Sequence, residues 1–267
     1  MELLAISVGN TRTRWGHFRG LGGRELDASG TLPNTEIAGV ADALLAVSLS
    51  NPSAPLVVAS VNEPVATALV ERLADPVSAR GGGVYRFGRD LAIPIQTALD
   101  DESTVGQDRL LDALGAFTRA KQACIVIDAG TAITVDFVDG QGVFQGGVIA
   151  PGLAMMLASL HEHTAALPRL AVEPPPAEPW GKDTRRAMLG GAHAAARGLV
   201  HLQINRYAEA YGAYPQVVAT GGDARALFEN DDLVEHIVPD LTLLGIQAAC
   251  EAQLSGGADG PADERDL

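Results

Sequence analysis

The residues best suited to chemistry in this sequence are an adjacent acid and base, Asp108 and Arg109. A carboxylate can accept the proton of an attacking hydroxyl, and the planar guanidinium of an arginine can hold a carboxylate or phosphate through paired hydrogen bonds. Asp108 falls at the start of an expected helix, where the helix dipole favours an ionised carboxylate. Without further context, a surface salt bridge in a first helical turn accounts for the pair slightly better.

Three glycine turns are candidates for binding phosphate groups. Gly9 and Gly130 each follow a short apolar run, and Gly221 and Gly222 follow the apolar stretch Val217–Thr220, just before an expected helix. Glycine lets a ligand approach the main chain, and successive N–H groups in such turns can cradle an anion. Each turn alone is more often an ordinary tight turn, but together they suggest ATP.

The elements that would position these residues occur twice. Leu3–Ile6 and Arg14–Phe18 predict a β-hairpin, and Cys124–Asp128 with Ile133–Val138 predicts a second one. Each hairpin carries a polar residue two positions before its glycine. Because solenoids repeat every ~20–50 residues, one recurrence at this larger spacing indicates an internal duplication that forms two α/β lobes with a cleft between them.

Further elements are expected between the two hairpins. Residues 36–49 and 64–74 have helical periodicity, and Leu56–Ser60 is a strand-like run. Thr104 is expected to cap another helix, which would carry Asp108 near its start.

These elements divide the chain into an N-terminal lobe at residues 1–118 and a C-terminal lobe at residues 119–254. The last stretch, residues 255–267, is rich in small and acidic residues and is expected to form a disordered tail.

Composition limits the expected partners and location. The chain has 33 acidic and 19 basic residues, a formal charge of −14 and no basic cluster, so nucleic acid is not an expected partner. No apolar run approaches the ~18–20 residues that cross a bilayer, so no membrane is expected either. The start, Met1–Ser7, does not resemble a secretion signal, and two cysteines form no disulfide framework. A soluble, cytoplasmic protein is expected.

Several other kinds of site are disfavoured. His161 and His163 lie two positions apart, which is not a zinc-ligand spacing on a helix. Gly181–Thr184 resembles the end of a phosphate-binding loop, but Pro176 stands where that loop requires glycine. Cys124 opens an apolar strand and is expected to be a buried packing residue rather than a nucleophile.

Seven short motifs occur in order along nearly the whole chain: Val8–Thr11, Val105–Arg109, Asp128–Ala132, Gly146–Gly152, Thr164–Pro168, Gly181–Thr184 and Ala219–Gly222. In order and spacing they resemble those of the type III pantothenate kinases, a family of the actin-like, sugar-kinase and Hsp70 ATPase superfamily. Each motif alone is weak, whereas seven in register make a specific match. The resemblance implies two duplicated actin-like (ribonuclease H-like) lobes, with mixed β-sheets flanked by helices and an interlobe cleft.

The resemblance also implies an activity, the ATP-dependent phosphorylation of pantothenate to phosphopantothenate, which is the first step of coenzyme A biosynthesis. Phosphoryl transfer chiefly requires an aligned attacking oxygen and neutralised phosphate charge, usually with Mg²⁺ and a positioned carboxylate. In the family's Gly-x-Asp-Arg motif, Asp108 would be the catalytic base, and Gly106, Asp108 and Arg109 would bind the substrate. A sugar or acetate kinase of the same superfamily is disfavoured because the chain is short.

Other site residues follow from the same resemblance. The implied nucleotide-binding residues are Ser7, Gly9, Asn10, Thr11, Gly130, Thr131, Thr220, Gly221 and Gly222. Asp128 matches an aspartate that the family uses near a monovalent cation, K⁺ or NH₄⁺. Thr184 matches a threonine that reaches towards the pantothenate pocket of the neighbouring subunit, so a homodimer is implied.

The sequence departs from the family at Ser7, where an aspartate normally organises the metal or its water. A hydroxyl brings no formal charge to Mg²⁺, and in a dry site the loss could cost several kcal/mol. Two hypotheses therefore stay open: an active kinase that compensates at Ser7, or a catalytically impaired member with a binding or regulatory role, a possibility that the related Bvg accessory factor group suggests. Leu99–Glu102 also replaces a Tyr-x-Asn-Pro-like element that contacts substrate.

Overall fold

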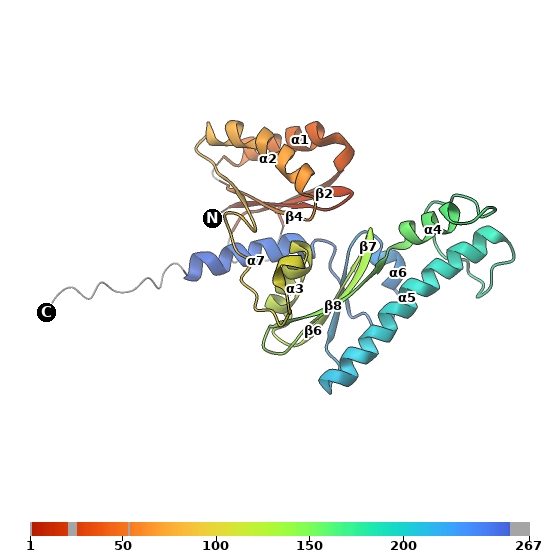
Figure 1. The fold of residues 1–267 in the computed structure, drawn as a ribbon. Coiled ribbons are helices and arrows are strands. Elements are labelled where there is room, and N and C mark those ends of the chain that lie inside the picture. The colour runs from red at the N-terminus through yellow and green to blue at the C-terminus, as the bar shows by residue number, and fades with distance from the viewer. Residues whose placement is uncertain (1, 21–25, 53, 257–267) are drawn as a thin grey trace. The chain divides into compact units, whose positions relative to one another are not determined.

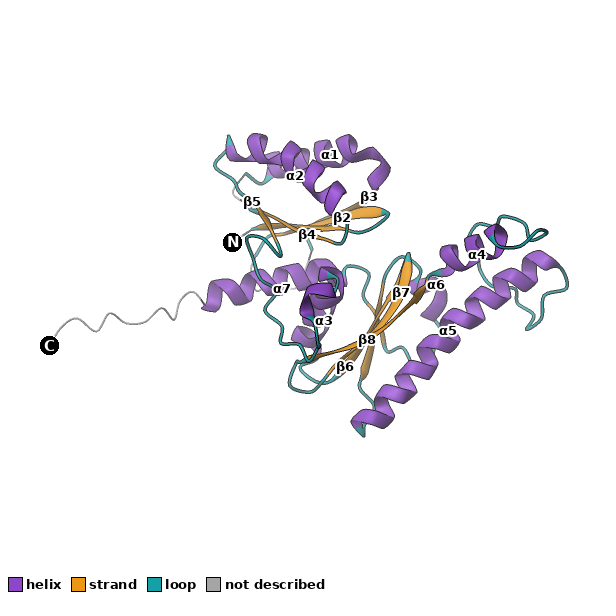
Figure 2. Ribbon diagram, viewed as in Figure 1, coloured by secondary structure: helices purple, strands orange, loops and turns teal. Residues whose placement is uncertain are grey.

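A computed structural model describes residues 2–20, 26–52 and 54–256. Figure 1 follows its elements along the chain, and Figure 2 distinguishes helices, strands and loops. The tail expected at residues 255–267 lies outside the described residues from 257 onward, and its first two residues end helix α7 (Leu241–Gly256).

The chain forms two compact units that are discontinuous in sequence. Unit 1 comprises the chain up to Pro94, Gly106–Gly115 and the chain from Thr242 onward, and unit 2 comprises Ile95–Val105 and Ala116–Leu241. The lobe boundaries expected at residues 1–118 and 119–254 stay a prediction.

Unit 1 is built on a five-stranded mixed sheet. Its elements are β1 (Leu3–Val8), β2 (Arg12–Phe18), β3 (Ala28–Pro33), the 3₁₀ turn η1 (Asn34–Glu36), α1 (Ile37–Ser50), β4 (Leu56–Ser60), α2 (Glu63–Ser78), β5 (Val84–Arg86), the start of α3 (Gln107–Ala120) and α7. The strand order is β3-β2-β1-β4-β5, in which β1–β2–β3 is an antiparallel meander and β4 and β5 are parallel to β1. Two-residue alternation therefore assigns each β1 side chain to one of two faces.

Helices α1 and α2 cover one face of this sheet (Figure 1). Leu4, Ile6 and Val8 point to that face and belong to a buried cluster with residues of both helices. On the alternate positions of β1, Ser7 points to the opposite face. Helix α7 lies on that opposite side, since a Cβ atom added at Gly16 of β2 would lie 3.0 Å from Cδ1 of Leu243.

Unit 2 repeats the same plan. Its elements are η2 (Glu102–Thr104), the end of α3, β6 (Cys124–Ala129), β7 (Ala132–Val138), β8 (Phe144–Pro151), α4 (Leu153–Glu162), α5 (Thr184–Tyr211), β9 (Gln216–Thr220), α6 (Ala224–Phe228) and β10 (His236–Ile237). The sheet order β10-β9-β6-β7-β8 is that of unit 1 in reverse, with β6–β7–β8 antiparallel and β9 and β10 parallel to β6. The expected internal duplication and two-sheet α/β fold are confirmed.

The core of unit 2 lies between its sheet and the helices α4, α5 and α6. Ile125, Ile127 and Ala129 of β6 pack in one buried cluster with residues of these helices, among them Ile204 of α5. Asp128 therefore lies on the other face of β6, as Ser7 does on β1.

Both predicted hairpins, strand β4 and the helices at 36–49 and 64–74 are confirmed within a few residues. The prediction that Thr104 caps a helix is wrong. Thr104 lies in the 3₁₀ turn η2, whose cap is Asp101, and α3 begins at Gln107. None of the helices among the described residues is long and apolar enough to span a membrane.

Candidate functional site

The carboxylate of Asp108 lies in the first turn of α3, folded back towards the start of the helix. Its Oδ1 accepts a hydrogen bond from the backbone N–H of Arg109 at 2.8 Å. A Cβ atom added at Gly106 would lie 2.5 Å from this oxygen and 3.4 Å from Cγ1 of Val61. Glycine at position 106 therefore leaves the space that the carboxylate occupies, and a first-turn position keeps it near the positive end of the helix dipole.

The β1–β2 turn holds the first group of expected phosphate-binding residues. The N–H of Gly9 donates to the carbonyl of Arg12 at 3.0 Å and closes the turn around Asn10 and Thr11. Asn34 secures it, since its Nδ2 donates to the carbonyl of Gly9 at 2.7 Å and its backbone N–H donates to the carbonyl of Thr11 at 3.0 Å.

A second asparagine completes this arrangement. Nδ2 of Asn62, which caps α2, lies 3.3 Å from the carbonyl oxygen of Asn10. The carbonyls of residues 9–12 are thus all engaged by donors of unit 1. Anions avoid carbonyl oxygens, so a turn whose carbonyls are held by the protein is suited to binding a phosphate through its N–H groups. Neither asparagine is recognisable as a site residue from the sequence, because both come from segments far from the turn along the chain.

The end of β4 connects the β1–β2 turn with the start of α3. The N–H of Val61 donates to the carbonyl of Val8 at 3.0 Å, and the preceding N–H, that of Ser60, donates to Oε1 of Gln107 at 3.1 Å. Unit 1 therefore brings Ser7, the Gly9–Thr11 turn and Asp108 to the same end of its sheet.

Unit 2 brings together the expected residues of the second and third turns. The N–H of Gly130 donates to the carbonyl of Ala132 at 2.9 Å. Gly221, which follows β9, has a left-handed φ of +97°, and a Cβ atom there would overlap the carbonyl oxygen of Ala129 and Oδ1 of Asp128. Only glycine satisfies both this conformation and this close approach.

The residues of these two turns differ in how far they are exposed to solvent. Thr131 and Gly222 are exposed, whereas Thr220 is buried and its hydroxyl lies 3.4 Å from the carbonyl oxygen of Pro239. The side chain of Thr220 is thus turned into the protein. Any contact that Thr220 makes with a nucleotide must use its main chain.

Thr184 is placed on a separate segment, as the first residue of α5. It is exposed, and the helix start is capped by Asp183, whose Oδ1 accepts from the N–H of Arg186 at 2.7 Å. In Figure 1 this end of α5 lies beside α4. Unit 2 does not bring Thr184 to the turn formed by Asp128 and Gly221.

The oxygen donors around Asp128 suit a hard cation. Asp128 is half-buried at the end of β6, where its Oδ1 faces the backbone of Gly221. Across the described ranges, no group of three or more His, Cys, Asp or Glu side chains converges as a metal site.

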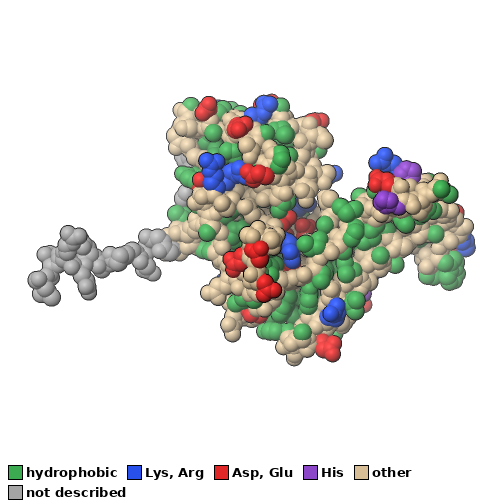
Figure 3. Space-filling view, viewed as in Figure 1, with side chains coloured by type: hydrophobic (Ala, Val, Ile, Leu, Met, Phe, Trp, Pro, Cys, Tyr) green, Lys and Arg blue, Asp and Glu red, His purple; other side chains and the backbone are tan. Residues whose placement is uncertain are grey.

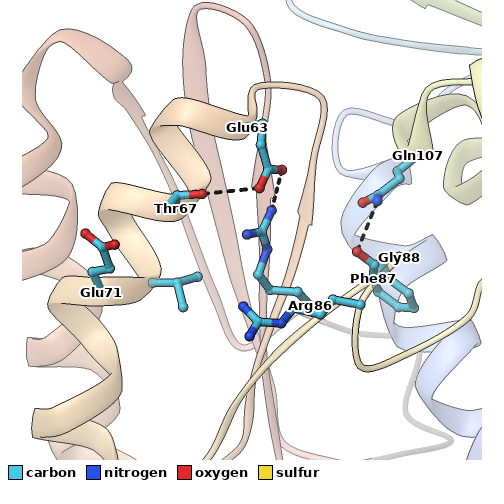
Figure 4. Close-up of a pocket in the computed structure, with 9 residues that line it drawn as sticks. Glu63, Thr67, Glu71, Arg86, Phe87, Gly88 and Gln107 are labelled. Atoms are coloured by element: carbon cyan, nitrogen blue, oxygen red, sulfur yellow. Dashed lines mark hydrogen bonds and ion pairs between the residues drawn. The ribbon is translucent and has the colours of Figure 1, made fainter.

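A separate cavity of about 310 Å³ opens in unit 1 between α2, β5 and the start of α3 (Figure 4). Across it, Nη2 of Arg86 donates to Oε2 of Glu63 at 2.6 Å. This hydrogen bond holds the pKa of the Glu63 carboxyl below its usual value. The cavity is lined by Gln107 but by none of the expected site residues.

Both cysteines are unsuited to nucleophilic chemistry. Burial raises the pKa of the Cys124 thiol to about 12, and burial together with the charge of Glu251 raises that of Cys250 to about 11. Since the thiolate is the reactive form, both are unreactive near neutral pH. The expectation that Cys124 is a buried packing residue is confirmed.

Solved structures with the same fold are diverse in function. A Baf family transcriptional activator from Campylobacter jejuni superposes with a TM-score of 0.61 at 19% identity, over 95% of this chain and 100% of that one. The activator of 2-hydroxyisocaproyl-CoA dehydratase from Clostridium difficile, solved with bound ADPNP, gives a TM-score of 0.52 at 16% identity, over 98% of this chain and 100% of that one. At these identities the likeness shows the fold alone.

The relatives found by sequence similarity point to one family. A type III pantothenate kinase from Akkermansia muciniphila is 42% identical over 151 residues, which cover 56% of this chain and 62% of that protein. Another, from Acidiphilium cryptum, is 42% identical over 149 residues and 56% of each chain. The chain thus aligns with less than two thirds of the length of these curated relatives.

Longer matches cover almost the entire chain. The type III pantothenate kinase of Rubrobacter xylanophilus is 32% identical over 257 residues, 92% of this chain and 96% of that protein. The sequence profile of the family matches residues 3–206, which is more than half of the chain and includes both hairpins and the start of α3. The chain belongs to the type III pantothenate kinase family.

Proposed function

We propose that this protein transfers the γ-phosphoryl group of ATP to the primary hydroxyl of pantothenate. The observation that carries the proposal is the carboxylate of Asp108, fixed at the start of α3 in a space that Gly106 leaves open, in a chain of this family. Phosphoryl transfer requires little covalent chemistry from the protein, so positioning and charge dominate the catalysis.

Asp108 acts in this proposal as the proton acceptor. The helix dipole and the N–H of Arg109 both favour its ionised form, so it can accept the hydroxyl proton of the acceptor. Arg109 binds the carboxylate of pantothenate, since a guanidinium matches a carboxylate with two parallel hydrogen bonds. In this proposal Gly106 lines the substrate site, and it also leaves the space that the Asp108 carboxylate occupies.

Each unit supplies main-chain groups for the nucleotide. In unit 1 the carbonyls of the turn at Gly9, Asn10 and Thr11 are engaged by the protein and the N–H of Gly9 closes the turn, which favours a phosphate at the N–H groups of Asn10 and Thr11. In unit 2 we assign the same role to the segments Gly130–Thr131 and Thr220–Gly222. There, the close approach of Gly221 to Ala129 places the two segments side by side.

Two kinds of cation are part of the proposal. Mg²⁺ travels with the ATP phosphates and offsets their charge, with Ser7 offering only a hydroxyl towards it or its waters. We assign a monovalent cation, K⁺ or NH₄⁺, to Asp128, because its carboxylate is half-buried and hard cations prefer oxygen ligands.

We further propose a cytoplasmic homodimer in which Thr184 contributes to the partner subunit's pantothenate site. Unit 2 exposes large apolar side chains, including Ile149 of β8 (64% exposed) and Leu202 of α5 (57% exposed). Figure 3 shows apolar side chains exposed at the surface of unit 2. Leu202→Glu should therefore convert a dimer to a monomer in light scattering, whereas Leu49→Glu, at a similarly exposed position on α1 (58% exposed), should leave it dimeric.

The decisive experiment incubates the purified protein with ATP, pantothenate, Mg²⁺ and K⁺ and measures phosphopantothenate by mass spectrometry. Asp108→Asn should lower kcat by about 10²–10⁴-fold, the usual contribution of general-base catalysis, with the protein still folded by circular dichroism. A wild-type protein that binds ATP and pantothenate without forming product would instead support the impaired, regulatory alternative suggested by Ser7.

A further inference from the structure

The side-chain amide of Gln107 occupies a position that a backbone hydrogen bond would fill in a continuous sheet. Strands β4 and β5 are parallel, with Val58 paired to Arg86, and the N–H of Phe87 donates to the carbonyl of Val58 at 3.0 Å. The next bond of such a ladder would join the N–H of Ser60 to the carbonyl of Phe87.

Instead, Gln107 bridges these two groups. Its Oε1 accepts from the N–H of Ser60 at 3.1 Å, and its Nε2 donates to the carbonyl of Phe87 at 3.0 Å. Figure 4 shows the amide of Gln107 directed at this carbonyl. A primary amide carries a donor and an acceptor, as a peptide group does, so it can extend the ladder where the strands diverge.

The backbone next to Phe87 is adapted to this side chain. Gly88 has a left-handed φ of +77°, and a Cβ atom added there would lie 2.7 Å from Nε2 of Gln107. A side chain at position 88 would therefore push the amide out of the ladder. The end of β4 thus holds Gln107 through the N–H of Ser60. The end of β5 holds it through the carbonyl of Phe87 and leaves room for it at Gly88.

We propose that Gln107 is a positioning residue, which fixes the first turn of α3 to the ends of β4 and β5 and so sets the place of the Asp108 carboxylate. The inference rests on the proposed function, in which Asp108 accepts the proton. The only covalent link between the two side chains is one peptide unit, so a shift of Gln107 moves the first turn and its acid together. Misplacing a catalytic group by about 1 Å can lower a rate by on the order of 10²-fold.

The first test replaces Gln107 with methionine, which has a similar length and shape but neither donor nor acceptor. Gln107→Met should lower kcat for pantothenate by about 10–100-fold while changing the KM for ATP by less than about threefold, because the displaced first turn carries Asp108 and Arg109 but none of the expected nucleotide-binding residues. Thr67→Val is the matched control. Thr67 lines the same cavity, but its hydroxyl donates to Glu63 at 3.2 Å, and Glu63 belongs to α2 rather than α3. This control variant should retain wild-type kcat.

The second test uses pH. In Gln107→Glu the ionised side chain keeps the acceptor for Ser60 but presents an oxygen to the carbonyl of Phe87, whereas the protonated side chain restores a donor. The ratio of variant to wild-type kcat should therefore rise as pH falls from 8 towards 5.5. The other charged groups around the cavity, Glu63, Glu71, Arg86 and Arg89, and Asp108 itself are present in both proteins, so the effect is measured as a ratio to the wild type.

Hydrogen exchange separates failure of this inference from failure of the proposed function. The amide of Ser60 should exchange faster in Gln107→Met than in the wild type, because its acceptor is gone, whether or not the protein is a kinase. Unchanged Ser60 exchange would overturn the anchor. Faster Ser60 exchange in Gln107→Met with kcat unaffected, or a pH-independent kcat ratio for Gln107→Glu, would overturn the positioning role. An inactive wild type would instead overturn the proposed function.

Discussion

Ser7 and Asp128 occupy equivalent positions in the two units. Ser7 of β1 pairs with Ala59 of the parallel strand β4, and Asp128 of β6 pairs with Thr220 of the parallel strand β9. Each lies two positions before the glycine of its turn, and both point away from the apolar cluster of their sheet. The duplicated frame therefore offers two equivalent positions on this face of the sheets, and only the one in unit 2 carries a carboxylate.

Introducing the missing carboxylate tests what this asymmetry costs. Ser7→Asp should lower the Mg²⁺ concentration for half-maximal activity by about tenfold, since a carboxylate on the metal or its waters adds about 1.4 kcal/mol of binding. Mg²⁺ titrations of the steady-state rate measure this effect. Ser7→Asn, which is similar in size but uncharged, should leave the Mg²⁺ dependence of the wild type, and equal effects of the two substitutions would exclude a charge effect.

Gly106→Ala tests whether displacing the Asp108 carboxylate lowers kcat without destabilising the fold. The new methyl group would meet Oδ1 of Asp108, the mobile end of a side chain, so the carboxylate rather than the backbone must move. We expect kcat to fall by about 10–100-fold, with a change in the free energy of unfolding below about 1 kcal/mol. Gly39→Ala, on the exposed side of α1 with no atom nearer than 3.9 Å, should leave kcat unchanged. A loss of stability without a loss of rate in Gly106→Ala would contradict the role given to this glycine.

Much of the fold follows from the sequence because its pattern is local. Each hairpin opens with a short apolar run that ends at a glycine turn, and the strand at Leu56–Ser60 is another short, mostly apolar run, so residues close in sequence determine both. Strands β3 and β8 lack such a pattern. Both contain glycine and end in proline, residues that disfavour strands, and they form because a neighbouring strand of the meander pairs with them.

The functional site is harder to predict from the sequence, because contacts between distant segments bring its residues together. Asp108 and the glycine turns are recognisable by residue type, but Asn34 and Gln107 act on groups 25 and 47 residues away, respectively, at Gly9 and Ser60. An asparagine or glutamine that supports a turn has no local signature. The start of α3 was misplaced at Thr104 because a threonine is a good helix cap, whereas the structure uses Asp101 to cap a separate 3₁₀ turn there.

Gly221→Ala should impair both folding and nucleotide binding. Its φ of +97° disfavours any side chain, and its Cβ atom would overlap the backbone of Ala129. We expect a loss of about 3 kcal/mol of unfolding free energy in denaturant titrations, combining the conformational cost with overpacking. Affinity for a non-hydrolysable ATP analogue should fall in calorimetry.

Gly212→Ala provides the matched control for this prediction. Gly212 ends α5 with a φ of +80° and no atom within 4 Å of an added Cβ atom, so only the conformational cost of about 1 kcal/mol applies. Its affinity for the ATP analogue should equal that of the wild type. If the two alanine variants were equally stable and bound the analogue equally, the close approach at Gly221 would have no energetic role.

A buried carboxylate ties α5 to the segment after α6 and should make unit 2 sensitive to acid. The side chain of Asp231 is 1% exposed, and its Oδ2 lies 2.9 Å from Nη2 of Arg197 and 2.7 Å from Nε2 of His201. Its Oδ1 accepts from the N–H of Leu233 at 3.1 Å. Burial alone would raise the pKa of this carboxyl, but the hydrogen bonds from His201, Leu233 and Arg197 outweigh it and hold the pKa below its ordinary value.

A carboxyl whose pKa is lowered by folding stabilises the folded state above its unfolded pKa of about 4, and this contribution is lost as pH falls through the folded value. Asp231→Asn should therefore lower the free energy of unfolding by about 2 kcal/mol at pH 7, the scale of hydrogen bonds to a charged group, and by progressively less below about pH 4. Urea titrations across this pH range measure the difference. Asp232→Asn, at the exposed neighbouring position, should show no such gap at any pH. A gap for Asp231→Asn that stays constant from pH 7 to pH 3 would mean that the contribution is one of packing, because a charge effect must vanish once the carboxyl is protonated in both states.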